Sequence, residues 1–228
     1  MSPRIKICGL MDAETISEMD GLLIHEVGFV FAKSKRQVNK ETAAELIQAL
    51  HKLKTANGVR PQAVGVFLNA TIEEIGDILT EAPLDVIQLH GDETPDYCKE
   101  LKKRYPEKQV WKVFAVQPNL VEIESDANIN DVALRLLRYN DSVDAILIDA
   151  PGGGTGEPFN WEAIASYKQE AGRYGLPLYI AGGLHSNNVQ ELVRNYSPDG
   201  IDVSSGVESN GRKDIDKIKL FVRRVIET

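Results

Sequence analysis

The strongest constraint on the fold is an alternation of short apolar runs with helical patterns, which recurs about eight times along the chain. Apolar runs of this length are typical of strands that are buried on both faces of a parallel sheet. Strands that alternate with helices predict parallel pairing through right-handed crossovers. In a chain of 228 residues, eight such units favour closure into a single (β/α)8 TIM barrel over an open doubly wound sheet.

The pattern also sets approximate bounds for each element. The expected strands cover residues 5–8, 23–31, 63–68, 86–90, 110–116, 145–149, 178–181 and 200–204. The expected helices cover residues 41–54, 71–80, 94–104, 161–174, 186–195 and 214–226, with weaker helical patterns over 12–19 and 119–139. No linker or low-complexity tract divides the chain, so we expect one domain over residues 1–228.

Charge and composition exclude several classes of partner. The net charge of −8 argues against a nucleic-acid or acidic-membrane binder, which needs a basic surface. No stretch approaches the length of a membrane span, and residues 1–6 enter a strand without an apolar signal region. Cys8 and Cys98 fit no metal-ligand spacing and favour free thiols in a reducing compartment. We therefore expect a cytosolic protein with no metal site and no nucleic-acid or membrane partner.

One strand end combines a lone carboxylate with a glycine-rich loop. The apolar run 145–148 leads into Asp149, and the glycines that follow could wrap a small ligand. The carboxyl ends of strands carry the chemistry of α/β folds, so Asp149 is a candidate site residue, although such an Asp can also simply cap a turn. The loop expected to lie over the site contains Gly153, Gly154, Thr155 and Gly156.

Other polar side chains follow the same geometry. By the two-residue period of a strand, three pairs share a face: Lys6 with Cys8, Gln88 with His90, and Asp202 with Ser204. If these faces point inward, a thiol, an imidazole and carboxylates line the mouth of the barrel. Each residue alone could instead have a structural role, as a small core residue, a hydrogen-bonded core histidine or a helix cap. In a closed barrel the first and last strands pair, so Lys6 and Asp202 should be neighbours with compensating charges.

Two glycine-containing loops indicate an anion site. Gly182-Gly183 follows the seventh expected strand, and Ser204-Ser205-Gly206 follows the eighth. These two loops commonly bind phosphate in TIM barrels through backbone amides. The sequence therefore predicts a phosphorylated small-molecule ligand, although the same glycines could merely form tight turns.

Seven segments taken together resemble one enzyme family. They are Lys6-Ile-Cys-Gly-Leu10, Gly28-Phe-Val-Phe-Ala32 with Ser34-Lys35-Arg36, Val64-Gly-Val-Phe67, Gln88-Leu-His-Gly-Asp92, Gly153-Gly-Thr-Gly156 with Phe159-Asn-Trp161, Ala181-Gly-Gly-Leu184 and Asp202-Val-Ser-Ser-Gly-Val-Glu208. Single segments are weak signals, but the ordered set is similar to phosphoribosylanthranilate isomerase. The likeness extends from the first strand to Lys213-Asp214.

The resemblance implies a (β/α)8 barrel that converts N-(5-phosphoribosyl)anthranilate into 1-(2-carboxyphenylamino)-1-deoxyribulose 5-phosphate in tryptophan synthesis, without a metal or an organic cofactor. It implies that Cys8 is the general base, Asp149 the general acid, and Arg36 the partner of the anthranilate carboxylate. No obligate protein partner is implied. The remaining residues expected to bind substrate are His90, Gly182, Gly183, Asp202, Ser204, Ser205 and Gly206.

The chemistry of this rearrangement calls for one acid and one base. A cysteine base must form the thiolate, which a nearby cation favours, and Lys6 on the same strand face is the expected cation. Asp149 must be protonated when it acts, which requires a partly desolvated site.

The chain departs from the family pattern at three places. It has Met11 where the family usually has Thr, residues 23–25 (Leu-Ile-His) in place of a Gly-Ala-Asp run, and Lys35 in place of a proline. These changes affect the entry into the first helix and the pose of Arg36, and they leave the expected acid and base in place.

Two alternatives compete with this interpretation. The first is another phosphosugar barrel, such as indole-glycerol-phosphate synthase, which uses lysine and glutamate, or ribulose-phosphate epimerase, which uses paired aspartates with a metal. The second is a non-catalytic barrel that senses a phosphorylated ligand. The pair Cys8 and Asp149 fits neither alternative well, and a turnover assay separates enzyme from sensor.

Overall fold

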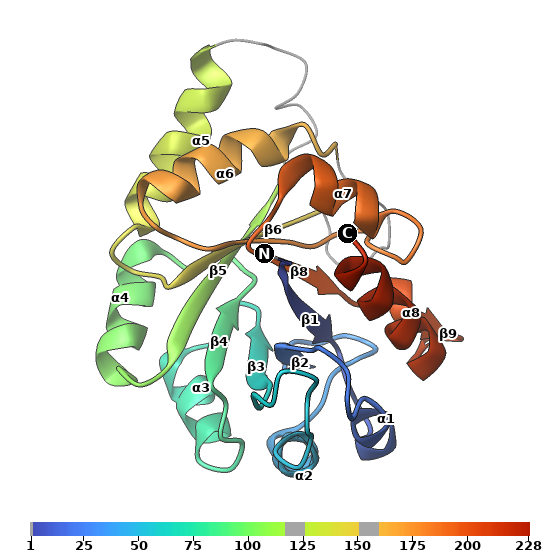
Figure 1. The fold of residues 1–228 in the computed structure, drawn as a ribbon. Helices are drawn as coiled ribbons and strands as arrows, with labels where there is room; N and C mark the ends of the chain where they lie inside the picture. The colour runs from blue at the N-terminus through green and yellow to red at the C-terminus, as the bar shows by residue number, and fades with distance from the viewer. Residues whose placement is uncertain (1, 117–125, 151–159) are drawn as a thin grey trace.

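The computed structural model describes residues 2–116, 126–150 and 160–228, and they form a closed barrel of parallel strands surrounded by helices (Figure 1). The barrel strands are β1 (Arg4–Cys8), β2 (Glu26–Val30), β3 (Gln62–Phe67), β4 (Val86–Leu89), β5 (Gln109–Ala115), β6 (Ala145–Asp149), β7 (Leu178–Ile180) and β8 (Gly200–Val203). The helices are α1 (Ala13–Glu18), α2 (Lys40–Leu50), α3 (Ile72–Leu79), α4 (Pro95–Arg104), α5 (Asp126–Tyr139), α6 (Ala163–Arg173), α7 (Val189–Tyr196) and α8 (Ile215–Ile226). The predicted TIM barrel is confirmed.

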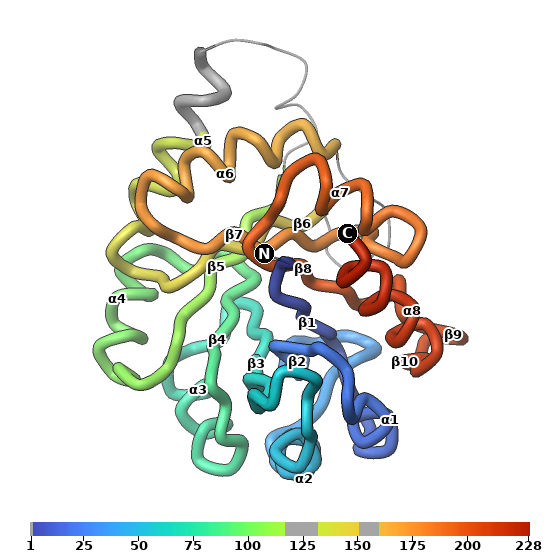
Figure 2. Tube along the Cα trace, viewed as in Figure 1, coloured from blue at the N-terminus to red at the C-terminus, as the bar shows by residue number. Residues whose placement is uncertain are grey.

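The ring closes where the chain's first and last barrel strands meet. Strand β1 pairs in parallel with both β2 and β8, and the β1–β8 register places Lys6 opposite Asp202. Figure 2 shows this closure as the blue start of the chain lying beside the red-orange segment of β8. A short 3-10 helix η2 (Ser205–Val207) follows β8, and a two-stranded hairpin of β9 (Glu208–Ser209) and β10 (Arg212–Lys213) leads into α8.

The two faces of the barrel sheet carry different cores. Alternate residues of each strand point to opposite faces, so each strand contributes to both. The large outer core lies between strands and helices and contains the odd-numbered residues of β1, such as Ile5 and Ile7. A smaller inner core consists of Val64, Val86, Trp111, Val113, Ala145, Leu147, Tyr179 and Ala181.

Aromatic side chains fill the amino-terminal half of the barrel interior. The rings of Trp111 and Tyr179 contact each other with centroids 4.4 Å apart. Gly200 makes room for this packing, because a Cβ there would lie 2.2 Å from the Tyr179 ring. With this half filled by bulky side chains, the space for a ligand lies at the carboxyl ends of the strands.

The bounds differ from the expected ones at the second strand and at the helix expected over 41–54, which already ends at Leu50. We predicted a strand over 23–31, but β2 begins at Glu26. The residues just before it form a loop that is hydrogen-bonded to β1. The backbone N–H of Ile5 donates to Nδ1 of His25 (3.0 Å), and the N–H of His25 donates to the carbonyl of Ile5 (2.9 Å). Ile24 is buried against the outer core, so its apolar character extends the hydrophobic run without extending the strand.

Both weak helical patterns do contain helices. Asp12 caps α1 by accepting a hydrogen bond from the N–H of Thr15. Helix α5 begins at residue 126, and residues 119–125 of the predicted segment lie outside the described part of the chain. Among the described helices, none combines the length and the apolar character that a membrane span requires. Cys8 and Cys98 are both buried free thiols.

Candidate active site

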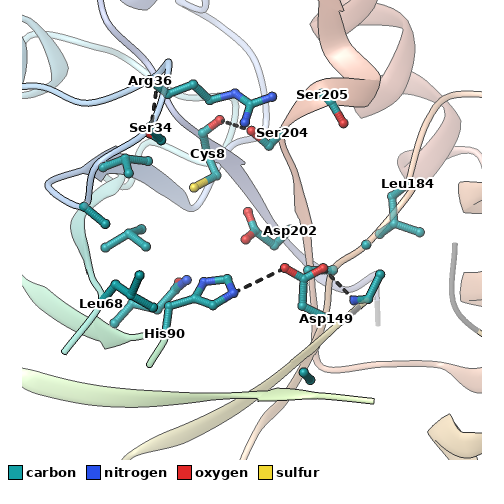
Figure 3. Close-up of a pocket in the computed structure, with 18 of the residues that line it drawn as sticks. Cys8, Ser34, Arg36, Leu68, His90, Asp149, Leu184, Asp202, Ser204 and Ser205 are labelled. Carbon is teal, nitrogen blue, oxygen red and sulfur yellow. Dashed lines mark hydrogen bonds and ion pairs between the residues drawn. The ribbon is translucent and has the colours of Figure 1, made fainter. Parts of the chain in front are cut away.

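A cavity of about 470 Å³ opens at the carboxyl ends of the barrel strands, a size suited to a small ligand. Nine of the predicted site residues line it: Cys8, Arg36, His90, Asp149, Gly182, Gly183, Asp202, Ser204 and Ser205. Figure 3 shows Cys8, His90, Asp149 and Asp202 around this space. Gly206 is not among the lining residues, and the predicted loop 153–156 lies outside the described residues.

A buried ion pair forms the floor of the cavity. Nζ of Lys6 donates to Oδ2 of Asp202 across 2.9 Å, and the Lys6 side chain is fully buried. Although burial opposes it, Asp202 raises the pKa of Lys6, so the ammonium stays charged. This contact confirms both the predicted pairing of the two residues and their inward orientation.

Cys8 lies at the end of β1 and contributes its thiol to the cavity (Figure 3). Gly28 on the neighbouring strand provides the space, because a Cβ there would lie 2.7 Å from Sγ of Cys8. Burial raises the pKa of the thiol, Asp202 raises it further, and Lys6 and Lys213 oppose the change. The expectation that Lys6 would favour the thiolate is therefore only partly right, since burial and the Lys6 counter-ion outweigh its charge.

Asp149 lies at the end of β6 beside His90 from β4. The distance from Asp149 Oδ2 to His90 Nε2 is 3.5 Å, and Oδ1 accepts a hydrogen bond of 2.7 Å from the N–H of Ala150 (Figure 3). Burial and then Asp202 raise the pKa of Asp149 to about 6. Burial, together with Lys6, lowers the pKa of His90, so the imidazole is neutral near pH 7. The carboxyl group can therefore exchange a proton near neutral pH.

Two buried polar atoms in the cavity lining lack hydrogen-bond partners among the described residues. They are Oε1 of Gln88 and Oδ1 of Asp202. Buried polar atoms normally have hydrogen-bond partners. Two acceptor oxygens without partners in a cavity therefore indicate a ligand that carries hydroxyl or amine groups. Gln88 was not among the predicted site residues, although its shared face with His90 was the signal for it.

The loops after β7 and β8 form another part of the rim. Gly182 and Gly183 have left-handed φ values of 84° and 63°, which favour glycine. The Asn188 side-chain amide donates to the carbonyl of Gly183 (2.9 Å) and fixes this peptide. Gly206 has no room for a side chain, because a Cβ there would lie 1.8 Å from the carbonyl oxygen of Leu184. The two predicted phosphate loops thus pack directly on each other.

Arg36 reaches the cavity from the loop after β2 and is bound by Glu208. Nε of Arg36 donates to Oε1 of Glu208 (2.6 Å), and Nη2 donates to Oε2 (3.1 Å). Lys213 also donates to Oε1 of Glu208 (2.7 Å). Gly9 makes room for the Arg36 side chain, since a Cβ there would lie 2.6 Å from its Cδ. Sequence reasoning assigned no site role to Glu208 or Lys213, although both fall within the segments that resemble the family.

An apolar wall lies between the loop that carries Arg36 and the strand that carries His90. It includes Val30, Val66 and Leu68, and Leu68 is 54% exposed. Ligand pockets are lined mostly by apolar side chains, so this wall is suited to the apolar part of a ligand. Leu68 was not among the predicted site residues, because an apolar residue at the end of an expected strand carries no reactive group.

Taken together, the lining is suited to acid–base chemistry on a small anionic ligand. It offers a thiol, a carboxyl group that titrates near neutral pH, unpaired acceptors for ligand hydroxyls, and an arginine at one side. Within the described ranges, no group of three or more His, Cys, Asp or Glu side chains is arranged to hold a metal ion.

Comparisons with known proteins agree with this geometry. The family model for N-(5'-phosphoribosyl)anthranilate (PRA) isomerase matches residues 5–224. The N-(5'-phosphoribosyl)anthranilate isomerase of Brevibacillus brevis is 44% identical over 226 residues, covering 97% of this chain and 93% of that protein. The crystal structure of phosphoribosyl anthranilate isomerase from Thermotoga maritima is similar with a TM-score of 0.77 and 30% identity, covering 99% of this chain and 100% of that one.

A further solved relative carries a bound ligand. It is a phosphoribosyl anthranilate isomerase in complex with reduced 1-(o-carboxyphenylamino)-1-deoxyribulose 5-phosphate, similar with a TM-score of 0.75 and 30% identity over 99% of this chain and 100% of that one. The family model, the curated relatives and the solved structures all match nearly the whole chain and all point to the same family. The chain belongs to the N-(5'-phosphoribosyl)anthranilate isomerase family, a family of aldose–ketose isomerases of tryptophan biosynthesis.

Proposed function

We propose that the chain converts N-(5-phosphoribosyl)anthranilate into 1-(2-carboxyphenylamino)-1-deoxyribulose 5-phosphate, with Cys8 as general base and Asp149 as general acid. One observation carries the proposal: a thiol and a carboxyl group with a pKa of about 6 share one cavity whose floor is a buried ion pair. A relative bound to the reduced form of this product supports the choice of substrate.

The first step opens the ribose ring. Asp149 gives its proton to the ring oxygen, the bond between this oxygen and C1 breaks with its electron pair going to the oxygen, and the nitrogen lone pair forms a C1=N double bond. The raised pKa of Asp149 supports this role, because a carboxyl group that titrates near pH 6 is a usable acid at neutral pH. Neutral His90 beside Oδ2 is suited to share a hydrogen bond with the carboxyl group.

The second step moves a proton away from the sugar. The Cys8 thiolate removes the proton from C2, and the electrons of that C–H bond form a C1=C2 double bond while the iminium nitrogen becomes neutral. In the resulting enol, the C1=C2 electron pair takes up a proton at C1 from the Cys8 thiol or from water, and the O2 hydroxyl loses its proton to water as the C2=O bond forms. Asp149 regains a proton from water, so both groups return to their starting states. Gln88 and Asp202, with their unpaired buried oxygens, are suited to accept hydrogen bonds from sugar hydroxyls during both steps.

Two anion sites are proposed to fix the ends of the substrate. Arg36 pairs with the anthranilate carboxylate, for which a guanidinium group is well shaped, and the ring lies on the wall that includes Leu68. The loops with Gly182, Gly183, Ser205 and Gly206 take the 5-phosphate through backbone amides, and Ser204 lies beside them. A crystal soaked in phosphate tests this arrangement, and an anion at Arg36 with none at these loops would reverse it.

Turnover decides between this enzyme and a ligand sensor. The substrate is mixed with purified protein and the loss of anthranilate fluorescence is followed. Cys8→Ala and Asp149→Asn should each lower kcat by about 10²-fold to about 10⁴-fold, the range for losing general acid–base help, while substrate binding changes little. Near-normal kcat in either variant would remove that residue from the mechanism. The cytosolic location stays a prediction of the sequence.

A further inference from the structure

Among the residues that the structure describes, the Arg36 guanidinium is bound by Glu208. Arg36 lies in a loop after β2, where its own N–H donates to Oγ of Ser34 (3.1 Å), and its side chain is only 10% exposed. The guanidinium contacts Glu208 along a single edge, through Nε and Nη2. Because a guanidinium has five N–H donors in a fixed plane, this contact leaves the Nη1 group and the second Nη2 hydrogen for another acceptor.

Glu208 is itself held by the hairpin that follows the last barrel strand. In the β9–β10 hairpin Glu208 lies opposite Lys213, and their side chains pair across 2.7 Å. Although burial opposes it, Arg36 and Lys213 lower the pKa of Glu208 to about 2, so the carboxylate is charged throughout the working pH range. Glu208 is therefore a fixed anion between two cations.

The same lysine connects this anion to the base and to the loop after β8. Nζ of Lys213 also donates to the carbonyl oxygen of Ser204 (3.0 Å) and to its Oγ (3.3 Å). Oγ of Ser204 donates to the carbonyl of Cys8 (3.0 Å). A continuous chain of polar contacts thus runs from Arg36 through Glu208, Lys213 and Ser204 to the backbone of Cys8.

We propose that Glu208 is the positioning residue of the carboxylate subsite, and that it acts by turning the free edge of the Arg36 guanidinium toward the substrate carboxylate. This deepens the proposed function and rests on its assignment of Arg36. Lys213 holds Glu208 in place and couples the subsite to the strand that carries the base. Lys35, whose Nζ lies 3.6 Å from Glu208 and whose side chain is 61% exposed, does not replace either contact.

A purely structural ion pair would behave differently from a positioning pair. A structural pair affects folding, and its loss would weaken the binding of every ligand to the same extent. A positioning pair affects only ligands that carry the group that Arg36 recognises, and its effect disappears once Arg36 is gone. These two signatures decide the experiment.

The test compares Glu208→Gln, Arg36→Met and the double variant, with Glu81→Gln as control. The control removes a carboxylate from an exposed ion pair with Lys40, on a residue that does not line the cavity. The ligands are N-(5-phosphoribosyl)anthranilate, its carboxamide analogue and inorganic phosphate. Glu208→Gln should raise KM for the carboxylate substrate by about 10-fold to about 100-fold, the range for a lost charged hydrogen bond, with kcat within about threefold of the parent.

The other measurements distinguish this from a general loss of structure. KM for the carboxamide and the inhibition constant of phosphate should stay within about twofold in Glu208→Gln, and Glu81→Gln should match the parent throughout. In the Arg36→Met background, Glu208→Gln should add no further rise in KM, because the two residues act as one unit.

Additive effects in the double variant, or an equal loss for carboxylate and carboxamide, would overturn the positioning role. If Arg36→Met alone left KM for the carboxylate substrate unchanged, the fault would lie in the proposed function and not in the coupling of the two residues. Lys213→Met serves if Glu208→Gln does not fold: it keeps the Arg36–Glu208 pair, and it should raise KM for the carboxylate substrate but not for the carboxamide. An equal rise for both would again overturn the proposal.

Discussion

Catalysis requires protonation states of Cys8 and Asp149 that only a minor part of the free protein holds. This predicts an unusual dependence of kcat/KM on pH. The active form needs the thiolate of Cys8 and the protonated carboxyl group of Asp149. Asp149 has a pKa of about 6, whereas the pKa of Cys8 is raised above its ordinary value of 9.0. Because the base has the higher pKa of the two, only a small fraction of the free enzyme carries both groups in the required state.

This fraction stays constant between the two pKa values. Raising the pH by one unit there makes about ten times more thiolate and leaves about ten times less protonated Asp149, so the product is unchanged. We expect kcat/KM to be flat from about pH 6 up to the raised pKa of Cys8, and to fall tenfold per pH unit outside this range. The acid limb then reports the pKa of Asp149, and the alkaline limb that of Cys8.

The assay is fluorescence-monitored kcat/KM from about pH 5 to about pH 10. The phosphate of the substrate also titrates near pH 6, so the pH dependence of binding is measured in parallel with the reduced product analogue and divided out. The thiol is titrated independently by its rate of alkylation with iodoacetamide in a Cys98→Ser background. A thiol pKa below about 8, or a narrow maximum in place of the plateau, would refute these assigned states.

Three further outcomes follow from the site and the barrel interior. Arg36→Met should mainly raise KM, because the carboxylate contact is remote from the reacting carbons, and steady-state kinetics with kcat within about threefold of the parent would check it. Gly206→Ala should weaken inhibition by phosphate by about tenfold or more, because its Cβ would displace the carbonyl of Leu184, and an unchanged inhibition constant would remove the two loops from phosphate binding. Burial raises the pKa of Glu26 from 4.5 to about 7, although the charge of Arg4 opposes this. The folded protein is therefore more stable when Glu26 is protonated. This stabilisation of about 3 kcal/mol is complete below pH 4.5 and is lost as the pH rises through 7; urea unfolding of Glu26→Gln should lack this slope.

Much of the barrel was predictable because it depends on local patterns. The strand β6 has the predicted bounds 145–149, since its apolar run ends at a charged residue that a Pro-Gly sequence follows closely. The two-residue period identified the inward faces, and barrel closure then predicted the contact between Lys6 and Asp202. The second strand was overestimated because burial of Ile24 in a loop looks the same, in sequence, as burial in a strand.

The contacts around Arg36 were not predictable in the same way. Glu208 is separated from Arg36 by 172 positions, and no periodicity relates a loop residue to a hairpin residue at that distance. The net effect on Cys8 was also not predictable from the sequence, although the expected influence of Lys6 is present. A nearby lysine suggests a thiolate, but the outcome depends on desolvation and on the lysine's own counter-ion, which only the packed barrel reveals.

The buried pair of Lys6 and Asp202 explains how such a site remains usable. A buried ion pair is weak evidence for stability, because desolvation offsets most of its attraction. The orientation of the pair matters more, because it affects the pKa values of Cys8 and Asp149. At Cys8 the lysine has the larger influence of the two and lowers the pKa, whereas at Asp149 the aspartate has the larger influence and raises it. The pair therefore acts as a dipole across the cavity floor that brings the two pKa values closer together. Each unit by which it narrows their gap increases the active fraction tenfold, and a pair of the same residues in reversed positions would decrease it.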